Sequence, residues 1–320
     1  MISSSLEIMI DRQGVRRVPK GFFIGHASDA EGMTGVTVIC FPDGARVGCD
    51  IFGGGPASRE TPLCSPLTAD NPVNAVVLSG GSAYGLEAST GVMSCLEEHG
   101  IGYDTSCALV PLVVQSCIYD LAVGKPGARP DAAMGRLACE RALANEGLLG
   151  DGPLMGPVGA GLGATVGKIC GMERCSASGL GIASARLGEL EMTAVVVVNA
   201  FGDVYDPDTG KQAAGLRTPD ISGLMSTADM MFEAGRARRP GENTTLGCVI
   251  TNAAFDKAEV NKLASMTRNA FARCIRPCAT TLDGDSCYAA SAGSLKADIN
   301  VCGVLACEVM EEAILRAVGA

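Results

Sequence analysis

Residues 241–247 read Gly-Glu-Asn-Thr-Thr-Leu-Gly, and they join two very different parts of the chain. Before them, residues 202–240 are polar and rich in turn-forming residues, which is typical of an exposed linker. After them, residues 246–251 are apolar and predict a buried strand. A backbone break between Asn243 and Thr244 would therefore leave Thr244 at the start of a strand, beside the core.

Strand-like apolar runs and helical patterns alternate along the rest of the chain. Residues 195–198 are all valine, which indicates a buried central strand. Pro42-Asp43-Gly44 predicts a hairpin, and Asp256 and Glu259 have the spacing of a helix capping box. We expect strands at residues 34–41, 45–52, 74–78, 109–119, 180–187, 193–199, 246–251 and 287–290, and helices at residues 83–98, 130–144, 256–275 and 297–318. This order predicts an α/β sandwich with helices outside paired sheets.

The composition is that of a globular, acidic protein. The 320 residues are 47% hydrophobic and 19% charged, which suits one large α/β domain or two small ones and argues against disorder. The net charge of −10, with no basic run, excludes nucleic acid as a partner. No apolar stretch approaches the roughly 18 residues that span a bilayer, so no membrane association is expected.

Cysteine usage bears on the compartment. The chain has 15 cysteines, mostly within apolar runs, and none forms a CxxC pair. This pattern predicts buried free thiols in a reducing cytoplasm. The N-terminal residues 1–7 also lack the apolar core of a signal peptide.

Two glycine-rich motifs do not carry the chemistry. Gly159-Ala-Gly161-Leu-Gly163 has the spacing of a dinucleotide fingerprint, but no strand precedes it and no helix follows it. Ser79-Gly-Gly-Ser82 precedes a helix but lacks the lysine of a phosphate loop. Close backbone packing is the role that we expect for these glycines.

The scarcity of histidine points to an unusual general base. Only His26 and His99 are present, and neither lies near a Gly-x-Ser-x-Gly elbow. An N-terminal Ser or Thr solves this problem, because its own α-amine can accept the proton of its hydroxyl. A break before Thr244 would create such a residue, although the residues alone favour a plain turn before a strand.

Several motifs, in order along the chain, resemble one family. They are Gly25-His26-Ala27, Thr34-Gly-Val-Thr-Val, Gly53-Gly-Gly-Pro-Ala-Ser-Arg-Glu-Thr61, Leu78-Ser-Gly-Gly-Ser-Ala-Tyr-Gly-Leu86, Asn243-Thr-Thr-Leu-Gly, and Arg276-Pro277 followed by Asp283-Gly-Asp285. Together they resemble the L-aminopeptidase/D-esterase family (DmpA-like peptidases), which includes β-peptidyl aminopeptidases and the nylon-oligomer hydrolase.

The resemblance implies both a fold and a maturation step. The fold would be an αββα sandwich of the N-terminal-nucleophile-like type, forming a single domain over residues 1–320. Self-cleavage between Asn243 and Thr244 would give chains 1–243 and 244–320, with Thr244 as the nucleophile. The resemblance also implies no metal, no organic cofactor, and a homo-oligomer such as a tetramer of processed heterodimers.

Asp283 and Asp285 are the expected acidic pair of the site. Alternate residues of an extended segment face one side, so the two carboxylates would interact, and one would stay partly protonated or pair with a cation. The resemblance implies that they orient the nucleophile, as in the nylon-hydrolase branch. The β-aminopeptidase branch has Ser-x-Glu here, so β-peptide specificity is not expected.

Three further residues match site positions of the family. Asn199 ends the valine-rich strand and would help hold the developing oxyanion. Tyr119 would donate its hydroxyl to the same oxygen, and Lys168 matches a site lysine. A turn asparagine, a core tyrosine and a surface lysine would look the same in the sequence.

The expected reaction is hydrolysis of an amide bond in a small peptide or amino-acid amide. The main hypothesis is an aminopeptidase that releases N-terminal amino acids from peptides, amides or esters. One alternative is an amidase or endo-type hydrolase of the nylon-oligomer kind, and another is an acyltransferase resembling ornithine acetyltransferase. A non-catalytic oligomeric scaffold would remain a single uncut chain.

Overall fold

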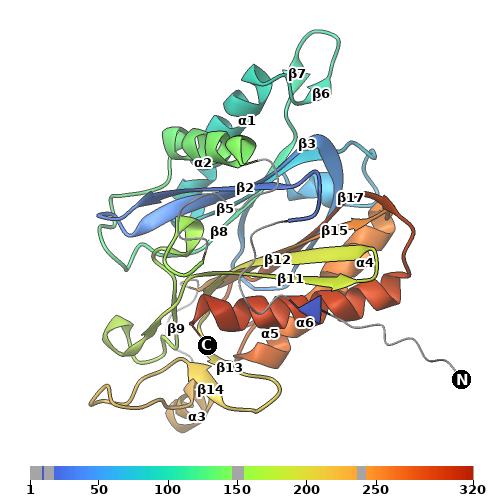
Figure 1. The fold of residues 1–320 in the computed structure, drawn as a ribbon. Coiled ribbons are helices and arrows are strands. Elements are labelled where there is room, and N and C mark those ends of the chain that lie inside the picture. The colour runs from blue at the N-terminus through green and yellow to red at the C-terminus, as the bar shows by residue number, and fades with distance from the viewer. Residues whose placement is uncertain (1–8, 11–17, 146–154, 236–242, 320) are drawn as a thin grey trace, which may run out of the picture.

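The computed structural model describes residues 9–10, 18–145, 155–235 and 243–319. Residues 1–7, residues 236–240 of the expected linker, and Gly241 and Glu242 lie outside the described residues. The described chain forms two stacked β-sheets with helices on both outer faces (Figure 1). The predicted αββα sandwich is therefore confirmed.

The two sheets share one long strand, β3. The first sheet has the order β1-β11-β12-β15-β17-β3, in which only β15 and β17 run parallel. The second sheet has the order β2-β3-β5-β8-β4. The strands are β1 (Met9–Ile10), β2 (Phe23–Asp29), β3 (Thr34–Ile51), β4 (Ala57–Arg59), β5 (Val73–Ser79), β6 (Tyr103–Asp104), β7 (Leu109–Val110), β8 (Val113–Cys117), β9 (Thr165–Val166), β10 (Ser176–Ala177), β11 (Leu180–Leu187), β12 (Leu190–Asn199), β13 (Asp203–Tyr205), β14 (Gln212–Ala214), β15 (Thr244–Ala253), β16 (Ile275–Arg276) and β17 (Ser286–Leu295).

The expected hairpin at Pro42-Asp43-Gly44 was wrong. β3 continues through these residues, and it pairs with β5 on one side of them and with β17 on the other. The register with β5 shifts between Cys40 and Ala45, and Gly44 has a φ of +80°, which glycine adopts without strain. The turn-forming residues thus bend one strand from one sheet into the other instead of reversing it.

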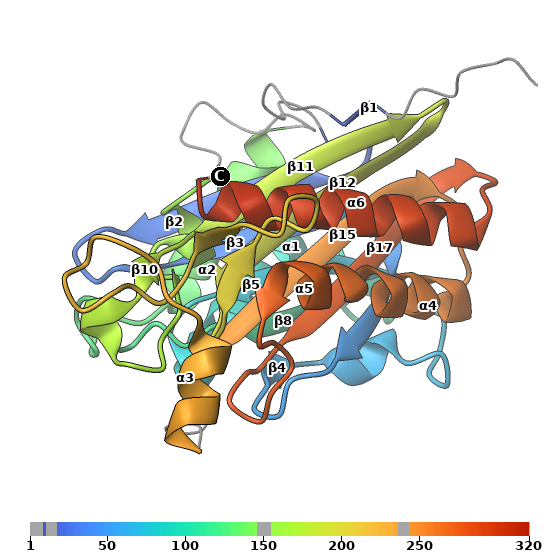
Figure 2. The ribbon, with the colours of Figure 1, turned by 90° about the horizontal axis from the view of Figure 1, so that it is seen from below.

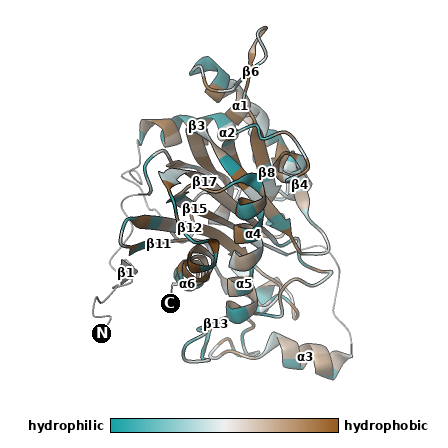
Figure 3. Cartoon of the chain, turned by 90° about the vertical axis from the view of Figure 1, so that its right-hand side faces the viewer, coloured by the Kyte–Doolittle hydropathy of each residue, from teal (hydrophilic) through white to brown (hydrophobic). Residues whose placement is uncertain are grey.

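The valine run of β12 shows how the layers are held. Val196 and Val198 face the core beneath the helices, whereas Val195 and Val197 face the core between the sheets. Strand alternation alone produces this division. All four side chains are fully buried, and each contributes about 2 kcal/mol of hydrophobic stabilisation. Figure 3 shows the resulting apolar strands between the two helical layers.

Helices cover the two outer faces of the sandwich. α1 and α2 pack on the second sheet, whereas α4, α5 and α6 pack on the first (Figure 2). The helices are α1 (Ala88–Glu98), α2 (Ala132–Ala144), α3 (Thr227–Ala234), α4 (Lys257–Thr267), α5 (Asn269–Cys274) and α6 (Ile299–Ala317).

Two of the predicted helices need correction. The expected helix 83–98 starts as a 3-10 turn at Ser82–Glu87, and the expected helix 256–275 is broken at Arg268.

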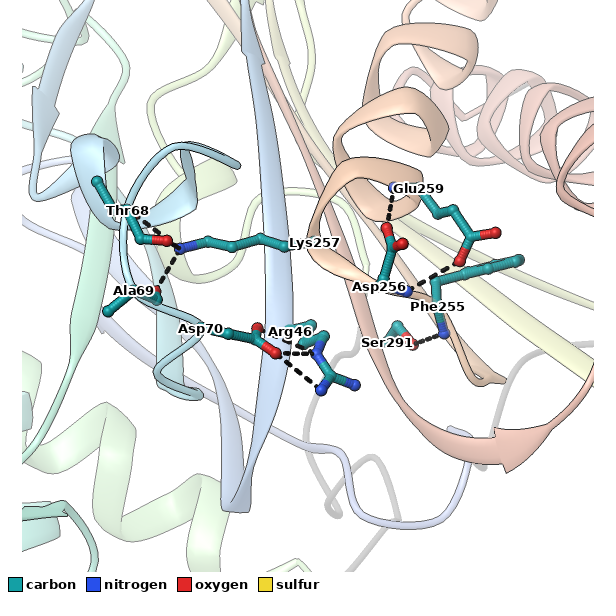
Figure 4. Close-up of polar contacts among 9 residues, drawn as sticks. All are labelled: Arg46, Thr68, Ala69, Asp70, Phe255, Asp256, Lys257, Glu259 and Ser291. Atoms are coloured by element: carbon teal, nitrogen blue, oxygen red, sulfur yellow. Dashed lines mark hydrogen bonds and ion pairs between the residues drawn. The ribbon is translucent and has the colours of Figure 1, made fainter.

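The N-terminus of α4 is fixed by polar contacts on both sides (Figure 4). Asp256 and Glu259 form the predicted capping box, with bonds of 2.8 and 2.9 Å. Lys257, only 9% exposed, donates to the hydroxyl of Thr68 at 2.7 Å and to the carbonyl oxygen of Ala69 at 2.6 Å. The ammonium group therefore anchors the loop that precedes β5 to this helix.

The expected linker is ordered over residues 202–235. β13 pairs with β14 and with β16, and α3 follows (Figure 1). The buried carboxylate of Asp203 accepts from the N–H of Leu216 at 2.8 Å and from the N–H and hydroxyl of Thr227 at 2.6 and 2.7 Å. The predicted exposure is confirmed, at least in part, for most of these residues, but the stretch is more regular than expected, because a buried acid organises the turn-rich residues.

Most cysteines lie buried as free thiols, as the sequence predicts, and only Cys107 is exposed. In the parts of the chain that the structure describes, no helix is both long enough and apolar enough to cross a bilayer.

The expected strand 109–119 is split into β7 and β8 around Pro111, since the nitrogen of proline has no hydrogen to donate to a neighbouring strand.

Candidate active site

Thr244 begins β15, which lies between β12 and β17 in the first sheet. The residue is only 4% exposed, and Asn243 before it is 3% exposed. The Thr244 Oγ1 lies 2.5 Å from the carbonyl oxygen of Asn243. The hydroxyl that the sequence singles out therefore touches the peptide bond that it is expected to cut.

Asn199, at the end of β12, is the Cα partner of Thr244. Its Oδ1 accepts from the ammonium of Lys168 at 2.6 Å and from the N–H of Thr165 at 3.2 Å. Its Nδ2 donates to the carbonyl oxygen of Tyr119 at 3.0 Å. These partners fix the orientation of the amide, because both neighbours of Oδ1 are donors.

Tyr119 meets this cluster through its backbone. Its carbonyl oxygen accepts from Asn199, and its side chain is half-buried. Within the described residues no hydrogen bond of the Tyr119 hydroxyl is seen, so its expected donation to an oxyanion stays a prediction. The sequence also allowed Lys168 to be an ordinary surface lysine. The structure rules this out, since the Lys168 ammonium donates to both the side chain and the carbonyl oxygen of Asn199.

Asp283 is fully buried in the turn before β17. Its Oδ1 accepts from the N–H of Phe201 at 3.2 Å. Its Oδ2 accepts from the N–H of Thr280 at 3.1 Å and from the Thr280 hydroxyl at 2.6 Å. Thr280 was missed in the sequence, where nothing distinguishes it from an ordinary turn threonine.

Asp285 holds the strand that carries the nucleophile. Its Oδ1 accepts from the N–H of Thr245 at 2.7 Å, and its Oδ2 from the N–H of Ala279 at 2.9 Å. Burial, with the nearby charge of Asp283, raises the pKa of Asp285 to about 7, and burial also raises the pKa of Asp283. The Lys168 ammonium opposes both shifts. The pair therefore favours retention of a proton near neutral pH, as the spacing predicts.

The acids do not act on the hydroxyl directly in the uncut chain. Within the described residues, neither carboxylate bonds to Thr244 Oγ1, and Asp285 instead binds the backbone of Thr245. The Thr245 hydroxyl is buried without a partner among these residues, so it packs rather than hydrogen-bonds. The expected pairing of Asp283 and Asp285 with a Thr244 ammonium stays a prediction.

The glycine segment at residues 53–55 clamps this turn. Gly53 and Gly55 donate to the carbonyl oxygens of Asp285 and Asp283 at 3.1 and 2.9 Å. A Cβ on Gly53 would lie 2.2 Å from the nitrogen of Asp285. Only residues without side chains allow the two backbones to approach this closely.

A third buried carboxylate, Asp120, was also missed. It accepts from the Thr34 hydroxyl and from the N–H of Gly81, both at 2.7 Å. Burial raises its pKa, and the charge of Lys168 lowers it. A Cβ on Gly80 would lie 1.9 Å from its Oδ2, so close packing is the role of these glycines, as expected.

The fold is shared with solved aminopeptidases. An L-aminopeptidase D-Ala-esterase/amidase from Ochrobactrum anthropi, described as a variant of the Ntn hydrolase fold, matches 96% of this chain and 88% of its own, with a TM-score of 0.67 at 16% identity. A β-aminopeptidase from Burkholderia sp. matches 96% of this chain and 88% of its own, with a TM-score of 0.62 at 19% identity. The sandwich therefore has the fold of these aminopeptidases, the described variant of the Ntn hydrolase fold.

The chain belongs to Peptidase family S58, which matches residues 18–320. An uncharacterized aminopeptidase of Mycobacterium leprae is 39% identical over 272 residues, which are 82% of this chain and 72% of that protein. A 6-aminohexanoate-oligomer endohydrolase of Kocuria sp. is 33% identical over 318 residues, covering 93% of this chain and 84% of that protein. The predicted family is confirmed, and the protein is a hydrolase.

Proposed function

We propose that the protein cuts its own backbone between Asn243 and Thr244 and then uses the freed Thr244 to release N-terminal amino acids from peptides, amides or esters. The contact of 2.5 Å between Thr244 Oγ1 and the carbonyl oxygen of Asn243 carries this proposal. A hydroxyl held within hydrogen-bond distance of this peptide group is already positioned close to the bond that it would attack.

Self-cleavage would begin as an N-to-O acyl shift. Oγ1 of Thr244 bonds to the carbonyl carbon of Asn243, the C–N bond breaks, and the hydroxyl proton ends on the departing nitrogen. The product is an ester between Asn243 and Thr244 Oγ1. Water then splits the ester, leaving a carboxylic acid on Asn243 and a free hydroxyl and amine on Thr244.

Turnover would repeat this chemistry on a substrate. A free α-amine has a pKa of about 8, so that of Thr244 can accept the proton of its own hydroxyl near neutral pH. Oγ1 attacks the substrate carbonyl, the amine product leaves, and water releases the acid from the acyl-enzyme. Asn199 and Tyr119 would hold the oxyanion, while Lys168 keeps Asn199 in place.

Asp283 and Asp285 would orient the new ammonium of Thr244. Both are buried close to the strand end that carries it, and Asp285 already binds the next residue of that strand. A partly protonated pair suits this role, because it can pass from neutral to charged as the amine changes its own charge.

The second candidate is endo-type hydrolysis of amide bonds within a chain. The Asp-x-Asp pair supports it, as do relatives named 6-aminohexanoate-oligomer endohydrolase at 33% identity. Amino-acid p-nitroanilides and N-blocked amides separate the two candidates. Activity on blocked substrates alone would overturn the aminopeptidase proposal.

We also propose a cytoplasmic homo-oligomer of processed heterodimers. Val301 and Val304 on α6 are 47% and 61% exposed and, with Leu187, line an apolar hollow of about 350 Å³. Such a surface is suited to a second copy of the chain. Light scattering of the purified protein measures the assembly, and a monomer would contradict this part of the proposal.

The decisive experiment compares purified protein with a Thr244→Ala variant by denaturing electrophoresis and intact mass. Wild type should give two chains, the smaller beginning at Thr244, and the variant one uncut chain. Thr245→Val is the matched control, because it removes a neighbouring hydroxyl that has no partner among the described residues and should leave cleavage intact. A single active, uncut wild-type chain would overturn the proposal.

A further inference from the structure

The carbonyl oxygen of Asn243 has a second neighbour besides the nucleophile. The backbone N–H of Gly284 donates to it at 2.8 Å. This bond extends the parallel ladder of β15 and β17, since the bridge between Asn243 and Asp283 keeps the register of Leu246 and Ser286. The ladder thus ends on the oxygen of the bond that would be cut.

We propose that the Gly284 N–H is an oxyanion donor of self-cleavage, an inference that rests on the proposed function above. When Thr244 Oγ1 attacks, the carbonyl oxygen of Asn243 becomes negatively charged. A donor that already points at this oxygen stabilises that charge without reorganisation, and a single such donor is worth about 10²–10³ in rate. The departing Asn243 then frees the same N–H for the acyl oxygen of a substrate.

The surroundings explain why residue 284 is a glycine. A Cβ there would lie 2.7 Å from Thr244 Oγ1 and 2.7 Å from the carbonyl oxygen of Gly55. Any side chain would therefore occupy the space through which the hydroxyl approaches. The nucleophile and the donor can meet on one carbonyl only because this position has no side chain.

The direction of the N–H is fixed from both sides. Gly55 donates to the carbonyl oxygen of Asp283 at 2.9 Å, and Gly53 donates to that of Asp285 at 3.1 Å. The Asp283–Gly284 peptide, which carries this N–H, and the Asp285–Ser286 peptide that follows are thus both tied to one neighbouring segment. Such rigidity is what preorganised stabilisation of a transition state requires.

The donor can be removed without adding a side chain. Glycolic acid in place of Gly284 converts the amide N–H to an ester oxygen. We expect self-cleavage to slow by about 10²–10³, followed by intact mass over time. The same replacement at Gly247, an interior residue of β15 paired on both sides, is the control for losing one ladder bond and should leave the rate within a few-fold. Equal rates in the Gly284 ester and wild type would overturn the proposal.

A second measurement does not depend on catalysis or on folding of the ester. In the uncut Thr244→Ala precursor, labelled with ¹⁵N-glycine and ¹³C-asparagine, we expect a through-hydrogen-bond coupling from the Gly284 nitrogen to the Asn243 carbonyl. We also expect slow amide exchange at Gly284. Fast exchange, like that of the open turn residue Gly188, would overturn the proposal. A wild type that never cleaves would instead overturn the proposed function.

Discussion

Asp285 and Thr245 are joined by a hydrogen bond of 2.7 Å from the Thr245 N–H to the Asp285 carboxylate. The acid therefore holds the backbone of the residue next to the nucleophile rather than the nucleophile itself. Because it is also buried beside Asp283, its proton affinity is coupled both to the stability of β15 and to the state of the site.

This coupling predicts a pH-dependent stability. The Asp285 carboxyl keeps its proton up to about pH 7 in the folded protein but loses it near pH 4 in the unfolded chain. Between these values the folded state binds more protons, so the free energy of unfolding falls as pH rises, by about 1.4 kcal/mol per pH unit. Urea unfolding of the uncut Thr244→Ala precursor from pH 4 to pH 8 measures this slope.

The control is Asp285→Asn in the same precursor. Other buried carboxyls with raised pKa values, such as Glu311, contribute to the total slope and remain in the control. The difference between the two slopes therefore belongs to Asp285. Identical slopes would show that this carboxyl does not retain its proton.

Removing the Asn199 side chain should impair both cleavage and turnover. Asn199→Ala leaves the Lys168 ammonium and the Thr165 N–H without their Oδ1 acceptor and takes away a donor beside the nucleophile. We expect rates lower by about 10²–10³ and a loss of about 2 kcal/mol in the free energy of unfolding. Asn199→Asp keeps the acceptor but turns a second oxygen toward the Tyr119 carbonyl, so it should recover part of the stability but not the rates. Recovery of both would assign Asn199 a purely structural role.

An ester intermediate predicts that an added nucleophile can intercept self-cleavage. Hydroxylamine attacks esters far faster than amides, so wild-type precursor incubated with it should be cut sooner. The large chain should then end in a hydroxamate at Asn243, which peptide mass spectrometry detects. Thr244→Ala treated in the same way should stay uncut. A large chain that carries only the carboxylic acid, at an unchanged rate, would argue against the acyl shift.

Lys257 should be important for stability although it lies away from the site. Lys257→Met leaves the oxygens of Thr68 and Ala69 without their donor, and we expect a loss of about 2 kcal/mol, measured by urea unfolding. Lys262→Met is the matched control on the exposed side of the same helix and should change stability by less than about 0.5 kcal/mol. Equal effects would mean that the ammonium does not anchor the loop.

The layers could be predicted because the alternation of apolar and polar residues and the length of apolar runs are local signals in the sequence. The valine run of β12 and the capping box of α4 needed no tertiary information. Pro42-Asp43-Gly44 was misjudged because a bend between sheets and a hairpin use the same turn residues, and only the partners of the flanking halves decide between them. The regular structure within residues 202–235 was not predicted, because it depends on Asp203 and on hydrogen-bond donors distant from it in the sequence.

The site could be predicted only in part, because a sequence motif reveals side-chain chemistry but not the position of backbone groups. Thr244, Asn199 and the Asp283–Asp285 pair carry side chains whose chemistry is visible in a motif. Thr280, Gly284 and Gly53 contribute mainly backbone groups or an ordinary hydroxyl, so their importance depends on where the fold brings them.

The position of β15 and β17 in the first sheet has a consequence for any form of the protein whose chain is broken at Asn243. Both strands follow the break, yet they are flanked by β12 on one side and by β3 on the other, which precede it. Strands from the two pieces would lie side by side in one sheet, so each piece would supply hydrogen-bond partners for the other. The size and shape of the native protein would therefore change little after cleavage. We expect the two pieces to stay associated on dilution and to separate only when the sheet unfolds.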